Sequence, residues 1–168
     1  MKYLTLFVFV LMFSSCVEKE EGPVYGQWHE VNLTDSFGDE TGKTALQCIV
    51  KGKVSNSVLV DQDAFGVFSI SEGIMNIKLF DYSLETPAHF PGQFEWATVE
   101  IKKPDGEVEY EQLQIINSWI IDVDRVRLGV MLESAYNAKI AVTTKNADKS
   151  KNKYLFEVDT KGLIGGSE

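Results

Sequence analysis

Histidine and cysteine are scarce in this chain of 168 residues, which has two of each. The two histidines, His29 and His89, lie far apart, so no H-x-x-x-H or H-E-x-x-H zinc motif exists. The sequence also lacks a G-x-S-x-G elbow, a phosphate-binding loop and a dinucleotide fingerprint. These absences weigh against an enzyme, and we expect no catalytic residue, no metal ligand and no cofactor.

Basic residues are also fewer than acidic ones. Sixteen Lys and Arg residues stand against 25 Asp and Glu residues, which gives a formal net charge of −9. A field of this sign repels nucleic acid and anionic lipid headgroups. No run of Lys or Arg with interleaved aromatic residues offsets it along the sequence. We therefore expect no nucleic-acid partner.

The one long apolar run is too short to cross a bilayer, which takes about 20 residues. Lys2 precedes an apolar stretch from Tyr3 to Phe13, and two serines then lead to Cys16. This order is typical of a secretory signal, in which small residues precede the cleavage site. Phe13-Ser14-Ser15-Cys16 resembles the lipobox of bacterial lipoproteins, with Phe where Leu is usual. The resemblance implies that residues 1–15 are a removed signal peptide and that Cys16 carries the lipid. The alternative is an ordinary secretory signal cut elsewhere.

Charged residues follow Cys16 directly. Val17-Glu18-Lys19-Glu20-Glu21 is similar to the export signal of Bacteroidota-type lipoproteins, which implies the outer face of the outer membrane. A solvated tether has the same composition. We expect residues 16–26 to form an acidic tether and residues 27–168 to form one domain at the cell envelope. Its partners are then the membrane, through the lipid on Cys16, and an unidentified protein or glycan.

Short segments rich in Val, Ile, Phe and Tyr, separated by turn residues, fill most of the remaining chain. This pattern predicts a mainly β fold, an antiparallel sandwich or barrel. The expected strands are Gln27–Leu33, Lys43–Val50, Ser57–Val60, Val67–Ile70, Ile74–Tyr82, Glu95–Lys102, Val108–Ile115, Lys139–Thr144 and Tyr154–Val158. Lys103-Pro104-Asp105-Gly106 predicts a hairpin turn. Cys48 falls in a strand, which favours a buried, inert thiol.

The segment from Asp122 to Ser134 fits two structures. Val126, Leu128, Val130 and Leu132 alternate as in a strand. However, Asp122 and Asp124 stand where a helix start needs hydrogen-bond acceptors, and Val123, Val126 and Val130 have helical spacing. The periodicity alone does not decide between them.

Two motifs carry a resemblance to a family of uncharacterised bacterial proteins. They are Asp35-Ser36-Phe37-Gly38-Asp39-Glu40-Thr41-Gly42-Lys43 and Lys51-Gly52-Lys53-Val54-Ser55-Asn56-Ser57, followed much later by the closing strand Tyr154–Leu163. The resemblance implies an antiparallel β-sandwich with one short α-helix before the last two strands, which favours a helix at Asp122–Ser134. It implies no activity.

Both motifs have the composition of turns. Gly38 and Gly42 suit positive φ, Asp39 and Thr41 suit bonds to backbone amides, and Phe37 is expected to plug the end of the sandwich. A structural role is the favoured interpretation. The alternative is a shared polar binding patch made of Asp35, Asp39, Thr41, Ser55, Asn56 and Ser57.

Two further patterns suggest binding chemistry. Asp61, Asp63, Gly66 and Glu72 match positions of a calcium-binding EF-hand loop, but their flanks are strand-like, so we interpret Asp61–Asp63 as a hairpin tip. Aromatic residues near loops and strand ends could stack on sugar or clamp a peptide, although core packing is the favoured role for each. These aromatic residues are Phe90, Trp96, Trp119 and Tyr136.

The sequence as a whole predicts a lipid-anchored envelope protein that acts as a non-enzymatic binding or interaction module. The alternative is a hydrolase or metal-binding lipoprotein that uses His29, His89 or surface carboxylates.

Overall fold

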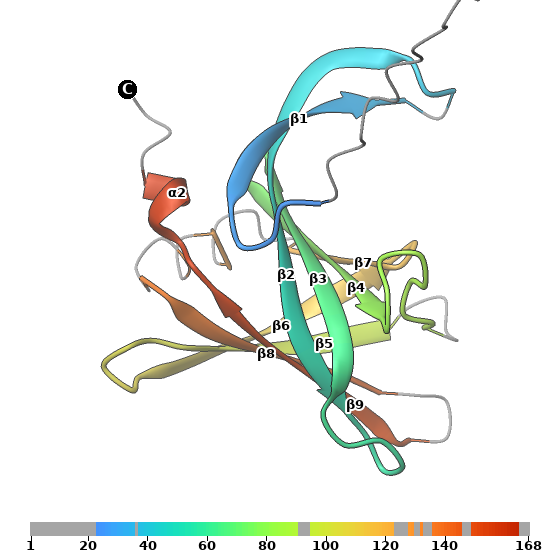
Figure 1. The fold of residues 1–168 in the computed structure, drawn as a ribbon, viewed down its shortest axis with the longest axis vertical. Coiled ribbons are helices and arrows are strands. Elements are labelled where there is room, and N and C mark those ends of the chain that lie inside the picture. Colours follow the sequence, from blue (N-terminus) through green and yellow to red (C-terminus); the bar gives the residue numbers. More distant parts are fainter. Residues whose placement is uncertain are drawn as a thin grey trace, which may run out of the picture.

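The structure is a computed structural model, and it describes residues 23–35, 37–90, 95–122, 128, 129, 132, 136–145 and 149–164. Within these residues the chain forms antiparallel strands, the short helix α2, and helical residues at 128, 129 and 132 (Figure 1). The elements are β1 (Trp28–Thr34), β2 (Glu40–Ser55), β3 (Gln62–Ser71), β4 (Ile74–Asp81), β5 (Glu95–Lys102), β6 (Val108–Ile116), β7 (Trp119–Ile121), β8 (Ala138–Lys145), β9 (Lys151–Val158) and α2 (Lys161–Ile164).

Eight of these strands form a closed antiparallel barrel. Neighbouring strands pair in the order β2-β3-β4-β7-β6-β5-β8-β9, and β9 pairs again with β2 to close the ring. In Figure 1, β2 and β3 run steeply while β5, β6 and β8 run across the view. The expected β-sandwich is therefore wrong, because the β2–β9 pairing joins what would otherwise be two separate sheet edges.

The helix expected at Asp122–Ser134 is described at only a few of its positions. Asp122 is buried, and its Oδ2 accepts a hydrogen bond of 2.9 Å from the Leu128 backbone N–H. Leu128, Gly129 and Leu132 are helical, and the other residues from 123 to 134 lie outside the described residues. A further single helical turn, α2, follows β9.

Closure of the barrel depends on glycines opposite one aromatic ring. β2 and β9 pair only from Gly52 to Ser55, with Gly52 opposite Phe156. A Cβ on Gly52 would overlap the Phe156 ring and the Leu155 carbonyl oxygen, and one on Gly66 would lie 3.1 Å from the same ring. The ring of Phe156 also packs edge-on against Phe68, with centroids 5.6 Å apart. Gly52 and Gly66 thus leave space for the Phe156 ring at the β2–β9 pairing that closes the barrel.

Buried apolar side chains from all eight barrel strands fill the interior. They include Cys48, Val50, Val54, Ala64, Phe68, Met75, Ile77, Leu79, Ala97, Val99, Ile101, Leu113, Ile115, Ile120, Ala138, Ile140, Val142, Tyr154, Phe156 and Val158. An eight-stranded barrel is just wide enough for its own side chains to fill it. The predicted burial of Cys48 is confirmed, and burial raises the pKa of its thiol to about 11. Because the interior is occupied, a ligand site is to be sought on the outer surface.

Several strand predictions are confirmed, with bounds that agree within a few residues. Glu95–Lys102 is β5 as expected, and Val108–Ile115 falls within β6. The turn between them has Gly106 at a φ of +93° and a hydrogen bond of 3.0 Å from the Gly106 N–H to the Lys103 carbonyl oxygen. Ser57–Val60 is a turn and not a strand, whereas Trp119–Ile121 forms a strand that the sequence did not predict.

β1 and the first half of β2 form a two-stranded arm that projects beyond the barrel (Figure 1). Phe37, at the tip of this arm, is 89% exposed. The expectation that Phe37 plugs one end of the domain is therefore wrong, because the turn that carries it extends away from the barrel core.

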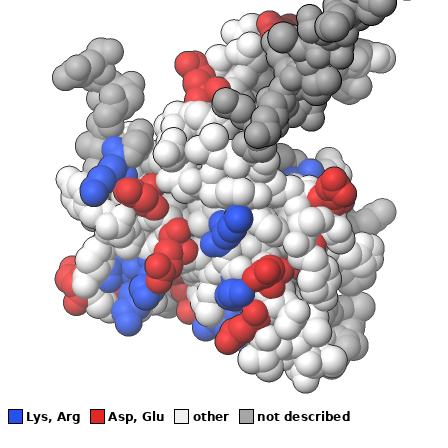
Figure 2. Space-filling model, viewed as in Figure 1, with Lys and Arg blue, Asp and Glu red and all other residues white. Residues whose placement is uncertain are grey.

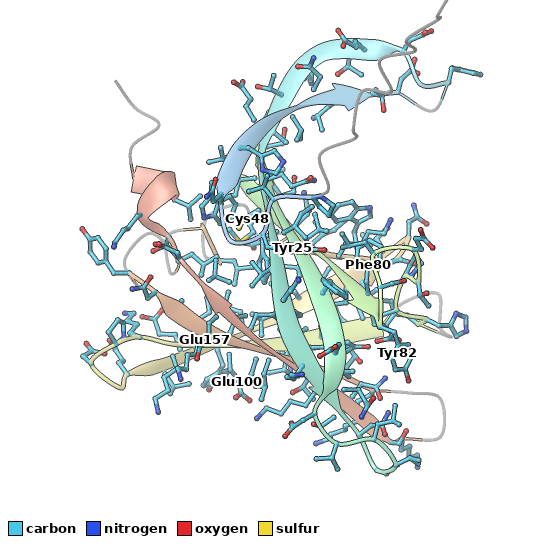
Figure 3. The ribbon with its side chains drawn as sticks, viewed as in Figure 1. Tyr25, Cys48, Phe80, Tyr82, Glu100 and Glu157 are labelled. Carbon is cyan, nitrogen blue, oxygen red and sulfur yellow. The ribbon has the colours of Figure 1, made fainter. Side chains whose placement is uncertain are left out.

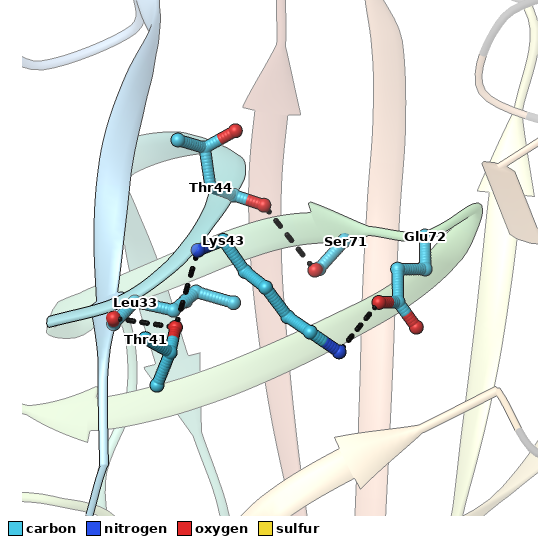
Figure 4. Close-up of polar contacts among 6 residues, drawn as sticks. All are labelled: Leu33, Thr41, Lys43, Thr44, Ser71 and Glu72. Carbon is cyan, nitrogen blue, oxygen red and sulfur yellow. Dashed lines mark hydrogen bonds and ion pairs between the residues drawn. The ribbon is translucent and has the colours of Figure 1, made fainter.

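The base of the arm is fixed to the neighbouring hairpin, as Figure 4 shows. Lys43 Nζ lies 2.8 Å from Glu72 Oε1 in the β3–β4 turn. The Ser71 hydroxyl donates a hydrogen bond of 3.3 Å to the Thr44 carbonyl oxygen. Two contacts between adjacent residues of β2 and the end of β3 therefore hold the arm against the β3–β4 hairpin.

Candidate functional site: a lysine groove on the outer face of the barrel

A groove of about 730 Å³ lies on the outer face of the barrel at the β2–β9 seam. We call it the lysine groove, and it is lined by Lys51, Gly52, Lys53, Asp63, Glu100, Lys102, Val108, Lys139, Ile140, Ala141, Lys153, Leu155, Phe156 and Glu157. In Figure 3, Glu100 and Glu157 mark its position beside β8 and β9. Basic and acidic side chains alternate over the lower half of the same view in Figure 2. The volume is typical of a site for a small ligand.

The floor of the groove follows from strand register. Ala141 of β8 lies opposite Glu100 of β5 on one side and Leu155 of β9 on the other. The same register continues across the neighbouring strands and gives one outward-facing row of side chains. In order, this row is Tyr110, Glu100, Ala141, Leu155, Lys53 and Asp63. The middle of this row is short or apolar, since Ala141 carries only a methyl group. Long charged side chains on both sides then form the walls.

Two of the lysines are engaged in exposed ion pairs. Lys53 Nζ lies 2.5 Å from Asp63 Oδ1, and Lys139 Nζ lies 2.9 Å from Glu157 Oε1. The hydrogen bond from Lys53 lowers the pKa of Asp63, and that to Glu157 raises the pKa of Lys139. Exposed pairs of this kind contribute only about 0–1 kcal/mol each. Either lysine can therefore exchange its partner for a ligand at little cost.

The other lysines are differently placed. Lys51 Nζ lies 4.2 Å from the centre of the Tyr25 ring, which itself contacts Phe65 with centroids 5.9 Å apart. Within the described residues, Lys102 and Lys153 have no ion-pair partner. These two cations are free to meet an anionic group in the groove.

Aromatic rings extend the outer face next to the groove. Tyr110, opposite Glu100, is 73% exposed, and Trp96, on the same face of β5, is 56% exposed. The structure therefore corrects the expected core role for Trp96. Trp119 is half-buried beside Lys78, and Trp28 is half-buried with its Nε1 donating to the Asp159 carbonyl oxygen at 2.8 Å.

The predicted polar patch is divided between two distant places. Asp35, Asp39 and Thr41 lie at the tip of the arm, where Asp35 Oδ1 accepts hydrogen bonds from the backbone N–H groups of Phe37 and Asp39 at 2.8 and 3.1 Å. The Thr41 hydroxyl donates to the Leu33 carbonyl oxygen at 2.8 Å. Gly38 and Gly42 have φ values of +88° and +72°, so the predicted positive φ is confirmed at both glycines. The predicted second turn at Thr41-Gly42 is wrong, because both residues belong to β2, opposite an irregularity in the β1 register.

Ser55, Asn56 and Ser57 lie at the opposite end of β2. Asn56 Oδ1 accepts hydrogen bonds from the backbone of Val58 and Leu59 at 2.9 and 2.8 Å. The Ser55 hydroxyl accepts one of 3.0 Å from the Asp61 N–H. Ser55 follows Thr41 by 14 residue steps along β2, which separates the two groups by up to about 46 Å at roughly 3.3 Å per step. They do not form one patch.

The residues considered for catalysis or metal binding are not brought together. His29 lies on β1, opposite Gln47, and His89 lies in the segment after β4; both are exposed. Among the described residues, no group of three His, Cys, Asp or Glu side chains could hold a metal ion. Asp63 and Gly66 belong to a continuous strand, β3, which agrees with our rejection of an EF-hand. Cys16 lies outside the described residues.

Sequence reasoning missed the lysine groove because its lysines come from four strands. Lys51 and Lys53 belong to β2, and the other three belong to β5, β8 and β9. No continuous run of lysines in the sequence indicates such a site. The available hint was the alternation Lys51-x-Lys53 and Lys151-x-Lys153, which places lysines on one face of each strand.

No family model, no curated protein and no solved structure matches this chain. The family resemblance expected from the two motifs therefore stays a prediction. In the described part of the chain, no helix has the length and apolar character needed to cross a membrane.

Proposed function

We propose that this protein is a non-enzymatic binding module, anchored to the cell envelope by a lipid on Cys16, whose ligand is a short anionic molecule held in the lysine groove. The N-terminal sequence supports the anchor, since it has the order of a lipoprotein signal. The groove supports the binding role, since it is concave, partly apolar and rich in one kind of charge.

The observation that carries the proposal is the contrast between local and overall charge. Five lysines and three acidic residues line the groove, a local surplus of two positive charges. The whole chain has a formal net charge of −9. The lining of the groove therefore has a positive net charge, whereas the protein as a whole has a negative one. Opposite charges across an interface give specificity and faster association.

The same contrast limits the size of the ligand. A long polyanion such as nucleic acid would extend past the groove onto the acidic remainder of the surface and be repelled there. A short anionic ligand that fits within about 730 Å³ meets only the lysines and the apolar floor. The proposal is therefore a small-ligand site and not a nucleic-acid interface.

Titration calorimetry on the full chain in detergent tests the proposal, with hexaglutamate and hexagalacturonate as anionic probes and hexalysine as the cationic one. We expect at least one anionic probe to bind, more weakly as salt rises, and hexalysine not to bind in the groove. The Lys102→Glu/Lys153→Glu variant should weaken anion binding about tenfold or more, since each reversal replaces an attraction by a repulsion.

Lys145→Glu/Lys161→Glu is the matched control, because it makes the same change in net charge at exposed lysines outside the groove. Weakening confined to the groove variant supports the proposal. Equal weakening by both variants, or no binding of either anionic probe, overturns it.

A further inference from the structure

We infer that the ligand of the lysine groove is a carboxylated oligosaccharide, such as a uronic acid oligomer. This inference rests on the proposed function and names the chemistry of its ligand. It depends on three features of the groove that a simple anion site would not need: a free carboxylate at the centre, an exposed aromatic ring beside it, and no free strand edge.

The free carboxylate belongs to Glu100. It lies between Ala141 and Tyr110 in the outward-facing row, and within the described residues it makes no ion pair with any of the surrounding lysines. A carboxylate in the middle of a basic groove repels a ligand that carries only negative charge. It is well suited to a ligand that also carries hydroxyl groups, because an ionised carboxylate is a strong hydrogen-bond acceptor.

The aromatic ring is that of Tyr110, directly opposite Glu100. At 73% exposure its flat face is open to a sugar ring, and the apolar Val108 and Leu155 are likewise exposed at 51% and 45%. Trp96 lies four residues before Glu100 on the same face of β5, about 13 Å away at roughly 3.3 Å per residue. A ligand of several sugar units could reach from one ring to the other.

Polar side chains with both donors and acceptors lie between these rings. On β6, Gln112 lies opposite Thr98 and Gln114 lies opposite Trp96. Thr143 of β8 continues the row from Thr98. Amide and hydroxyl groups can donate to one sugar hydroxyl and accept from another. This part of the surface adds hydrogen-bonding capacity without adding charge.

An acidic peptide is the competing ligand, and the sheet argues against it. Peptides commonly bind β proteins by adding a strand to an exposed sheet edge. Along the groove, Glu100 is paired with both β6 and β8, Ala141 with β5 and β9, and Leu155 with β8 and β2. Every strand that crosses the middle of the groove is thus already paired on both sides. The backbone of a bound peptide would therefore have no unpaired strand edge to hydrogen-bond with in the groove.

Glu100→Gln separates the two ligands by the sign of its effect. If Glu100 accepts hydrogen bonds from sugar hydroxyls, the change to Gln weakens hexagalacturonate binding by about threefold or more. If the ligand is recognised by charge alone, removing the central negative charge tightens binding. The exposed Glu85→Gln serves as control for the one-unit change in overall charge.

The experiment titrates the full chain in detergent with hexagalacturonate, with hexaglutamate of the same charge, and with neutral maltohexaose, following tryptophan fluorescence and heat. We expect hexagalacturonate to bind at least tenfold more tightly than either of the others. Tyr110→Ala should weaken it roughly three- to tenfold. Phe37→Ala, which removes a still more exposed ring at the tip of the arm, should have no effect.

The inference is overturned if hexaglutamate binds as tightly as hexagalacturonate or if Glu100→Gln tightens hexagalacturonate binding. In that case, loss of hexaglutamate binding in Lys102→Glu/Lys153→Glu would still uphold the anionic site. The failure of the ligand class is therefore distinguishable from the failure of the proposed function.

Discussion

Gly52 in β2 lies against the ring of Phe156 in β9, so closely that there is no room for a Cβ. This contact closes the barrel, because β2 and β9 pair over only four residue pairs. It also sets the floor of the lysine groove, which both residues line. The stability of the fold and the shape of the site therefore depend on the same contact.

Gly52→Ala should consequently be strongly destabilising. The added methyl group must displace either the ring or the Leu155 carbonyl, and overpacking of this kind costs about 1–3 kcal/mol or more. Chemical denaturation of the full chain measures the loss. Gly129→Ala is the matched control, since a Cβ there meets no atom within 4 Å. Equal stability of the two variants would show that the seam is looser than described.

Asp81 should make stability depend on pH. Its Oδ1 accepts a hydrogen bond of 3.0 Å from the Tyr154 hydroxyl, yet burial raises its pKa above the ordinary value of 3.8 in spite of that bond. The folded state thus holds the proton more tightly than the unfolded state does. The contribution of Asp81 is fully favourable below about pH 3.8 and is lost as pH rises through its folded pKa.

Asp81→Asn removes this cost while keeping an acceptor for Tyr154. We expect the variant to melt at a higher temperature than the unmodified chain at pH 7, and the difference to shrink as the pH approaches 4. Thermal melts followed by circular dichroism at several pH values measure both quantities. A lower melting temperature for Asp81→Asn at pH 7 would mean that the carboxylate stabilises the fold.

Cys48 should be unreactive in the folded protein. Burial raises the pKa of its thiol to about 11, so almost no thiolate exists at pH 8, and the sulfur is covered. The difference in thiol-reagent uptake between the chain and its Cys48→Ala variant should be near zero until denaturant is added. Because the unfolded thiol ionises near pH 9, stability should also fall as pH rises from about 9 to 11. Rapid labelling of the native protein at pH 8 would contradict this account.

The lipid anchor on Cys16 is testable by mass spectrometry of protein extracted from membranes. We expect an N-terminus at Cys16 with the added mass of acyl chains, since two or three chains together hold a protein firmly at a bilayer. Cys16→Ala should release the protein from the membrane fraction. Cys48→Ala should not, and it is therefore the control. A bare N-terminus at any other residue would remove the anchor from the proposal.

The sequence predicts the local parts of this fold and not its closure. Alternation and turn residues are sufficient to predict β5, β6 and the turn at Pro104, because their determinants lie within a few residues. Closure depends on the pairing of Gly52 with Phe156, which are far apart in the sequence. The mainly β class was predicted correctly. Nothing local distinguishes a strand that pairs across a seam from one at the edge of a sandwich, which is why the predicted sandwich was wrong.

The same distinction applies to the site. The motifs around Asp39 and Asn56 are visible in the sequence because each forms a local turn, and the structure shows them in turns at opposite ends of β2. The groove has no local signature, since Lys53, Glu100 and Lys153 meet only through strand register. Trp96 is exposed because it lies on the outward face of β5, and its hydrophobicity alone did not reveal which face points inward.

The most direct test of the account is a map of backbone amide chemical-shift changes in the full, isotope-labelled chain as hexagalacturonate is added. We expect the largest changes within residues 51–53, 98–102, 108–112, 139–143 and 153–157, which form the outer face around the lysine groove. Changes centred on the arm, at residues 28–46, or on the turn at residues 55–61 would contradict this expectation.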